Sequence, residues 1–252
     1  MNTTLGNVDY SIAHTEILGK SDRVRVAKQL LTIVQVHLKH KNLKSFLVLD
    51  IGCSSGIITR EIAKHSRKVI GIDVDGNAIK KAAVDFRSVK NLKFKVAKGE
   101  KIPFRKNCFD IVFCNQVYSY VSNPHKMMLE IKRVLKPGGI CLFTGDNLLR
   151  PVEPLYRLPL IRLLPKNITK YILSISGYKS YYIGSYKSYW GLKKLCNNFV
   201  IEDYTLEVIK HPKKYKFSKI LKYEKLINFT PSLILKLLEP FLPTFIFILK
   251  KN

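Results

Sequence analysis

The sequence predicts an α/β protein with a Rossmann-like, doubly wound sheet. Short runs of β-branched and aromatic residues alternate with helical segments through the middle of the chain, which is typical of parallel strands joined by crossover helices. A glycine-containing turn follows the first run, as expected where a first strand meets a ligand. Hydrophobic residues make up 46% of the 252 residues, enough to build a large core.

Five strands are expected in the middle of the chain, at residues 45–52, 68–73, 91–97, 109–115 and 138–145. Helices are expected after the first and second of these strands, at 57–66 and 76–86. Residues 123–139 read as a helix body with basic residues in its last turn and a Pro-Gly-Gly stop before the fifth strand.

The flanking regions are predicted to extend this core. We expect an amphipathic helix at 21–41 capped by Ser21, a helix at 189–199, a strand at 200–210, a basic amphipathic helix at 214–229 and a last strand at 244–251. Two closing strands with a helical insertion suit an antiparallel edge on a parallel sheet. The chain is divided accordingly into a helical cap (1–44), a core (45–147), a lid or substrate insertion (148–186) and a C-terminal part of the same sheet (187–252).

The first strand and its turn read FLVLDIGCSSG, at residues 46–56. A dinucleotide would call for G-x-G-x-x-G, whose second glycine lets the backbone approach a pyrophosphate. Here the turn is one residue shorter, and Ser54 stands where that glycine is expected. Asp50 lies two residues before Gly52 and would repel a pyrophosphate, whereas it suits an ammonium group. S-adenosylmethionine carries an ammonium and a sulfonium and has no phosphate.

A second acid completes this ligand hypothesis. Asp73 lies at the end of the second strand, about 20 residues after the turn, where a carboxylate can accept hydrogen bonds from ribose hydroxyls. The two acids therefore predict a nucleoside ligand with an amino-acid end at Asp50 and its ribose at Asp73.

Four blocks in order carry a family resemblance: VLDIGCSSG, VIGIDVD, KGEKIPFRKNCFDIVFCNQVYSYV and EIKRVLKPGG. Together they resemble the class I S-adenosylmethionine-dependent methyltransferases, of the type 11 methyltransferase domain, over about residues 45–147. The resemblance implies a seven-stranded sheet with an antiparallel last strand, adenine contacts around Gly99 and Glu100, and a substrate-facing edge at Asn115, Gln116 and Tyr118. The cofactor-binding residues predicted in this way are Asp50, Gly52, Cys53, Ser54, Gly56, Asp73, Val74, Gly99, Glu100, Asn115 and Gln116.

Two positions depart from the family pattern. Many relatives carry an Asp near position 98, where this chain has Lys98, so the adenine amino group must be contacted by backbone or by Glu100. Many also carry His-His after the fourth strand, where this chain has Ser119 and Tyr120, so no histidine base is carried over there.

Methyl transfer needs alignment of an acceptor more than it needs a base, because a sulfonium donor is already activated. The candidate catalytic residues are His14, Asn115 and Tyr118. Other candidate bases, each more often structural than catalytic in such positions, are His125 and the pair Glu153 and Tyr156.

The charge favours anionic partners. Lys and Arg total 44 against 18 Asp and Glu, a net charge of +26, and residues 148–252 alone hold 19 of the basic residues against 6 acidic ones. Prolines that would hold a flipped base after the fourth strand are missing, which disfavours nucleic acid. The lysines around an apolar stripe in residues 210–229 fit either an anionic membrane surface or a solvated helix face.

Location and acceptor class complete the expectations. Five cysteines without metal spacing predict reduced packing residues, no metal site and a cytoplasmic protein, peripheral at the inner membrane surface if the basic tail binds lipid. Residues 145–172 also resemble a lid of methyltransferases associated with cell-surface glycan synthesis. We therefore expect methylation of an oxygen or nitrogen of a small-molecule, glycan or lipid-linked acceptor. The alternatives are a non-catalytic S-adenosylmethionine-binding module and an RNA methyltransferase that docks through the basic surface.

Overall fold

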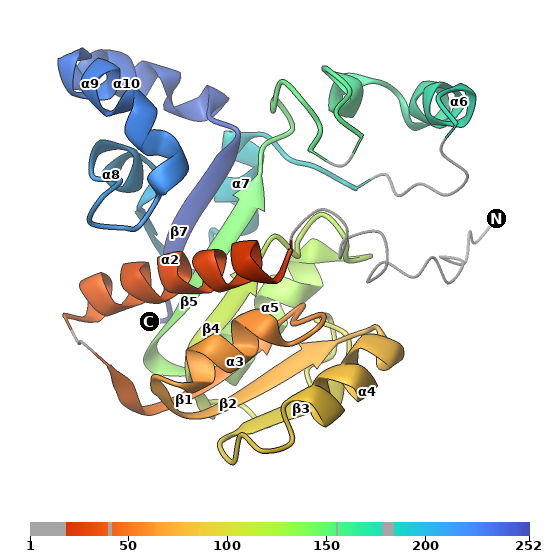
Figure 1. The fold of residues 1–252 in the computed structure, drawn as a ribbon, viewed down its shortest axis with the longest axis vertical. Helices are drawn as coiled ribbons and strands as arrows, with labels where there is room; N and C mark the ends of the chain where they lie inside the picture. Colours follow the sequence, from red (N-terminus) through yellow and green to blue (C-terminus); the bar gives the residue numbers. More distant parts are fainter. Residues whose placement is uncertain (1–18, 40–41, 155, 178–183) are drawn as a thin grey trace.

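A computed structural model of the chain describes residues 19–39, 42–154, 156–177 and 184–252. Its centre is a seven-stranded sheet of order β3-β2-β1-β4-β5-β7-β6 (Figure 1). The strands are β1 (Leu43–Ile51), β2 (Ser66–Asp73), β3 (Leu92–Val96), β4 (Phe109–Asn115), β5 (Leu135–Asp146), β6 (Val200–Asp203) and β7 (Thr244–Lys250).

The sheet confirms the predicted fold class. Strands β3, β2, β1, β4 and β5 are parallel, and β7 runs antiparallel to both of its neighbours, β5 and β6. The strand order reverses between β1 and β4, and in open parallel sheets ligands bind at the carboxyl ends of the strands on either side of such a reversal.

Helices cover both faces of the sheet (Figure 1). On one face lie α2 (Lys20–Leu38), α3 (Ile57–Ala63), α4 (Gly76–Asp85) and α8 (Thr205–Lys210); on the other lie α5 (Pro124–Val134) and α7 (Tyr189–Leu195). Beyond the sheet lie η1 (Ile161–Leu163), α6 (Lys166–Ile175), η2 (Ser218–Tyr223), α9 (Glu224–Phe229), α10 (Ser232–Leu238) and η3 (Glu239–Phe241).

Two apolar clusters hold these layers together. One joins α5 and α7 to the sheet through residues such as Met127, Ile131 and Leu192, all fully buried. The other joins α2, α3 and α8 to the opposite face through residues such as Ile33 and Ile62. Four of the five cysteines, all but Cys108, are buried, and all five are free thiols, as the sequence predicts.

The structure corrects three details of the sequence prediction. Helix α2 begins at Lys20 after Gly19 and has no side-chain cap, so Ser21 lies inside the first turn. The strand expected at 200–210 ends at Asp203, because its carboxylate accepts the Thr205 N–H at 3.0 Å and starts α8. The helix expected at 214–229 is broken, since Lys216 has a left-handed φ of 62°. The two closing strands, β7 and the edge strand β6, form the antiparallel edge of the sheet that the sequence predicts.

No helix among the described residues is long and apolar enough to cross a membrane.

We predict that the core depends strongly on β7. Phe247 is fully buried and stacks on Phe143 with a centroid distance of 6.2 Å, so Phe247→Ala should lower the free energy of unfolding by about 3 to 5 kcal/mol. Phe229 is 92% exposed, and Phe229→Ala should change it by less than about 0.5 kcal/mol. Urea unfolding followed by circular dichroism measures both, and equal losses would contradict this assignment of the core.

Candidate cofactor and acceptor site

The turn after β1 is shaped by two glycines in the left-handed region. Gly52 and Gly56 both have φ of 72°. A Cβ on Gly52 would lie 2.5 Å from Val117 Cγ2, and one on Gly56 would lie 2.6 Å from Phe94 Cζ. Both positions therefore require glycine for space as well as for backbone conformation. The Gly52 contact also brings the loop after β1 against the loop after β4.

The N–H groups of this turn are used inside the protein. The Gly52 and Cys53 amides donate to the Ile72 carbonyl at 2.8 and 3.1 Å, and the Ser54 amide donates to Asp73 Oδ2 at 2.8 Å. Ser54 reaches this position with a left-handed φ of 46°. Amides that already have partners cannot also cradle a pyrophosphate, which supports the argument against a dinucleotide.

Asp50 is buried under the turn, with 3% of its surface exposed. Its Oδ2 accepts the Thr59 hydroxyl at 2.7 Å. Burial raises the pKa of Asp50 to about 7, the Thr59 hydrogen bond opposes that shift, and the nearby Asp73 charge adds to it. The contact between Asp50 and the ammonium group of a ligand stays a prediction.

Asp73 stands at the end of β2, where its two carboxylate oxygens are held by backbone. Oδ2 accepts from the Ser54 amide and Oδ1 accepts from the Asp75 amide at 3.0 Å. Burial raises the pKa of Asp73, while these hydrogen bonds oppose the shift. Each oxygen keeps acceptor capacity for a ribose hydroxyl. Asp75 caps α4 by accepting from the amides of residues 77 and 78.

The cofactor residues predicted further along the chain lie around this pair of acids. Val74 follows Asp73 and is 64% exposed, an apolar surface next to the ribose position. Gly99 is packed against Met127, and Glu100 Oε1 accepts the amides of Ser122 and Asn123 at 2.9 and 3.3 Å. The Glu100 carboxylate thus anchors the start of α5, and the adenine contact at this turn stays a prediction.

The residues after β4 are fixed by Thr144 on β5. Asn115 Oδ1 accepts the Thr144 hydroxyl at 2.7 Å, and the Gln116 amide donates to the Thr144 carbonyl at 3.1 Å. Gln116 has a left-handed φ of 61°, a conformation that is unfavourable for a non-glycine residue and is often found at functional sites. Asn115 and Gln116 therefore lie in a preorganised turn that contacts the loop after β1 through Val117.

Tyr118 is fully buried. Its hydroxyl donates to the Asp146 carbonyl at 2.6 Å and accepts the Lys187 amide at 3.0 Å. Burial raises the pKa of Tyr118. Such a hydroxyl is suited to fix the loop after β4 against residues 184–187, so we assign Tyr118 a positioning role in place of a proton-transfer role.

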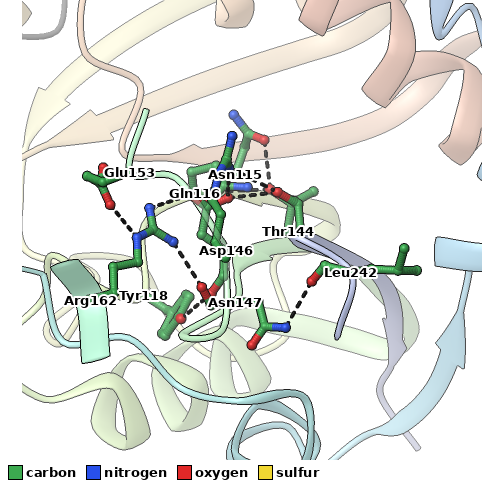
Figure 2. A network of polar contacts seen from close by, with 11 residues as sticks. Asn115, Gln116, Tyr118, Thr144, Asp146, Asn147, Glu153, Arg162 and Leu242 are labelled. Carbon is green, nitrogen blue, oxygen red and sulfur yellow. Dashed lines mark hydrogen bonds and ion pairs between the residues drawn. The ribbon is translucent and has the colours of Figure 1, made fainter. Parts of the chain in front are cut away.

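A network of polar contacts centred on Arg162 joins β5 to the insertion (Figure 2). The guanidinium is paired with Asp146 at 2.8 Å and with Glu153, donates to the Asn147 carbonyl at 3.0 Å and stacks on the Tyr186 ring at 3.7 Å. Burial alone would lower the pKa of Arg162, but the bonds to the two carboxylates hold it above its ordinary value. The insertion is therefore tied to the carboxyl end of the sheet.

A cavity of about 280 Å³ lies in the insertion next to this network. Its walls combine apolar and polar side chains. They include Leu148, Tyr156, Ile161, Leu164, Glu153, Arg162, Ser185 and Tyr186. The Ser185 amide donates to the Ser119 carbonyl at 2.9 Å, so the cavity borders the turn after β4.

The sequence reasoning did not identify Arg162 or Asp146. A single arginine within the apolar run LPLIRLL was the available signal, because a charged group in such a run needs buried partners. Glu153 and Tyr156 do line the cavity, but Glu153 is engaged by Arg162. His125 lies at the start of α5 and is not among the cavity-lining residues. His14 lies outside the described residues.

Comparison with known proteins agrees with this geometry. Residues 49–143 match the model of a methyltransferase domain family. This match confirms, over residues 49–143, the resemblance to the class I S-adenosylmethionine-dependent methyltransferases found in the sequence, and S-adenosylmethionine is the cofactor of that class.

Two curated relatives show how far the similarity extends. A demethylmenaquinone methyltransferase of Tropheryma whipplei is 30% identical over 158 residues, 62% of this chain and 64% of that protein. A ubiquinone biosynthesis O-methyltransferase of Coxiella burnetii is 30% identical over 114 residues, 45% of this chain and 47% of that protein. The chain spans less than two thirds of the length of these relatives.

A solved structure extends the comparison of the fold. The crystal structure of a SAM-dependent methyltransferase from Methanosarcina mazei is 21% identical and has a TM-score of 0.57, covering 86% of this chain and 96% of that chain. At this identity the likeness supports the fold alone.

We predict that cofactor affinity falls with acidification. With a pKa of about 7, Asp50 is mostly ionised at pH 8 and mostly protonated at pH 6, so a cationic ligand loses its attraction as the pH falls. The dissociation constant of S-adenosylmethionine should rise about tenfold between these pH values. Calorimetry at each pH measures this dissociation constant. Asp50→Asn should make the affinity nearly independent of pH, whereas the exposed control Asp85→Asn should keep the pH dependence of the parent. An unchanged slope in Asp50→Asn would contradict the assignment.

We also predict that Gly52 is required for its contact with Val117. Gly52→Ala and Gly138→Ala both place an alanine at a φ near 72°, a cost of about 1 to 2 kcal/mol each. A Cβ on Gly138 has nothing within 4 Å, whereas one on Gly52 meets Val117. Only Gly52→Ala should weaken S-adenosylmethionine binding, by about tenfold or more. Equal affinities of the two variants in calorimetry would rule out a steric role.

Proposed function

We propose that the chain is an S-adenosylmethionine-dependent methyltransferase that acts on an oxygen or nitrogen of a small-molecule, glycan or lipid-linked acceptor. The observation that carries the proposal is the convergence of Asp50, Asp73 and the turn at Gly52 on the loop after β4, which borders the cavity of the insertion. The cofactor residues and the acceptor cavity are therefore neighbours at the carboxyl edge of one sheet.

The residues present fit the cofactor. The two carboxylates give the site the charge that a ligand with an ammonium and a sulfonium requires. Gly52 and Gly56 let Val117 and Phe94 pack directly against the turn, which holds it in place between the two acids and the loop after β4. Asp73 would hold the ribose, and Val74 offers an apolar surface beside it. When bound, S-adenosylmethionine supplies a methyl group on a sulfonium, which an aligned nucleophile can accept directly.

The protein's contribution is alignment. Asn115 and Gln116 are held by Thr144, and Tyr118 and Arg162 hold the insertion over the same edge. Fixing an acceptor at such an edge can supply on the order of 7 to 11 kcal/mol of the barrier. Among the cavity-lining residues, Glu153 is ion-paired with Arg162, and burial raises the pKa of Tyr186, so neither is suited to accept a proton near neutral pH.

The cavity favours an acceptor with an apolar ring or chain and a few polar groups. Tyr156, Ile161 and Leu164 contribute apolar wall surface, while Arg162 and Ser185 contribute polar groups. The names of the two relatives refer to demethylmenaquinone and to ubiquinone biosynthesis, and both support a hydrophobic small-molecule or lipid-linked acceptor over a nucleic acid.

Calorimetry with S-adenosylmethionine tests the proposal. Asp73→Ala should weaken binding about tenfold to a hundredfold, because it removes a charged hydrogen-bond partner worth about 1.5 to 3 kcal/mol. The exposed Asp85→Asn, on α4, is the matched control and should bind like the parent. The absence of binding by the pure protein, or undiminished binding by Asp73→Ala, would overturn the proposal.

Turnover distinguishes the alternatives. Formation of S-adenosylhomocysteine with a quinol, phenol or glycan acceptor supports the enzyme. Cofactor binding without turnover in any cell extract would support a non-catalytic module instead. Turnover stimulated by RNA, with steeply salt-dependent RNA binding, would support an RNA methyltransferase.

A further inference from the structure

Residues 218–241, which we name the outer segment, form four short helices, η2, α9, α10 and η3. None of these four helices contains a buried residue. The outer segment nevertheless has many large hydrophobic side chains. Those that are exposed are Tyr223, Leu226, Phe229, Leu233, Ile234, Leu237, Leu238 and Phe241.

The degree of exposure is unusual for such side chains. Phe229 is 92% exposed, Leu233 71%, Leu226 68% and Leu237 66%. Isolated exposed hydrophobic residues are common in soluble proteins, but clusters of them mark a surface that binds something. The eight exposed hydrophobic residues of the outer segment lie within 19 positions of the chain, which is a high concentration for one surface segment.

Basic residues accompany these hydrophobic side chains. The outer segment contains four lysines, Lys219, Lys222, Lys225 and Lys236, and only two acidic residues. One of the acidic residues, Glu224, is paired with Lys213 at 3.1 Å. The whole chain carries a net charge of +26. Apolar side chains with lysines among them match an anionic lipid surface, where headgroups attract the lysines and acyl chains accept the apolar side chains.

Helix α6 adds a second exposed apolar element at the same end of the molecule. Ile168, Tyr171 and Ile175 are 48%, 66% and 67% exposed, and Lys166 and Lys170 are exposed beside them. Figure 1 shows α6 on one side of the arrowhead of β5 and α9 with α10 on the other, all beyond the upper end of that strand. Two such elements at one end allow one membrane surface to contact both.

We propose that the protein docks on an anionic membrane surface through the outer segment, with α6 as a second point of contact. Self-association through this face is opposed by charge repulsion, because each copy of the chain carries a net charge of +26. RNA matches this surface less well, because most of the exposed hydrophobic residues of the outer segment are Leu and Ile, which have no ring on which bases could stack.

Cosedimentation with lipid vesicles tests the docking, and it does not depend on methyl transfer. The full chain is mixed with vesicles of phosphatidylcholine alone or of phosphatidylcholine with phosphatidylglycerol. We expect binding to the anionic vesicles that weakens with added salt. Phe229→Asp should weaken it about tenfold or more, and Lys222→Gln with Lys225→Gln should weaken it about fivefold per lysine.

Val84→Asp is the matched control, because Val84 is 64% exposed on α4, outside the outer segment, and the substitution adds the same charge. It should bind anionic vesicles like the parent. Equal binding by Phe229→Asp and Val84→Asp, or no binding by the parent, overturns the proposal. Analytical ultracentrifugation gives a further test. A dimer that Phe229→Asp dissociates, together with no vesicle binding, would also overturn the proposal, because the outer segment would then join two copies of the chain. Calorimetry with S-adenosylmethionine on the same variants should be unchanged, which separates docking from the cofactor site.

Discussion

The hydrogen bond from the Ser54 amide to the Asp73 carboxylate is the constraint on which the cofactor site depends. It links the turn after β1 to the end of β2, and it is made by a residue in the left-handed conformation, Ser54. Asp50 lies beneath the same turn, so the two acids are held close enough for the charge of one to raise the pKa of the other. The predicted preference for a cationic ligand follows from this proximity of two acids, and the sheet order places them beside β4.

A second set of contacts extends the same edge toward the acceptor. Tyr118 and Arg162 are both buried and both bond to groups at the end of β5, one through the Asp146 carbonyl and the other through its carboxylate. The cavity is thus lined by a segment whose described residues form the short helices η1 and α6. Burying a charged group such as the Arg162 guanidinium costs free energy unless the group is paired. The insertion is therefore stable only in the arrangement that keeps Arg162 with its partners.

The parts of this protein that were predictable from the sequence are those governed by local rules. The five parallel strands and the two acids follow from apolar runs, a glycine turn and spacing, and β4 was placed at its observed residues. The predictions were wrong at Ser21, at 204–210 and at Lys216. At these places the hydrophobic pattern of a helix or strand continues in the sequence, but one backbone conformation or one side-chain hydrogen bond ends the element. Tyr118 and Arg162 could not be assigned their roles, because their partners are distant in the chain and only the fold brings them together.

Asn147 connects two parts of the molecule that have been treated separately. It is fully buried, its side-chain amide donates to the carbonyls of Pro240 and Leu242 at 2.9 Å, and its own carbonyl accepts from Arg162. One residue therefore stands between the end of the outer helices and the guanidinium at the cavity wall (Figure 2). Only two hydrogen bonds in series therefore separate the end of the outer helices from the arginine that lines the cavity, so the positions of these two regions are fixed relative to each other.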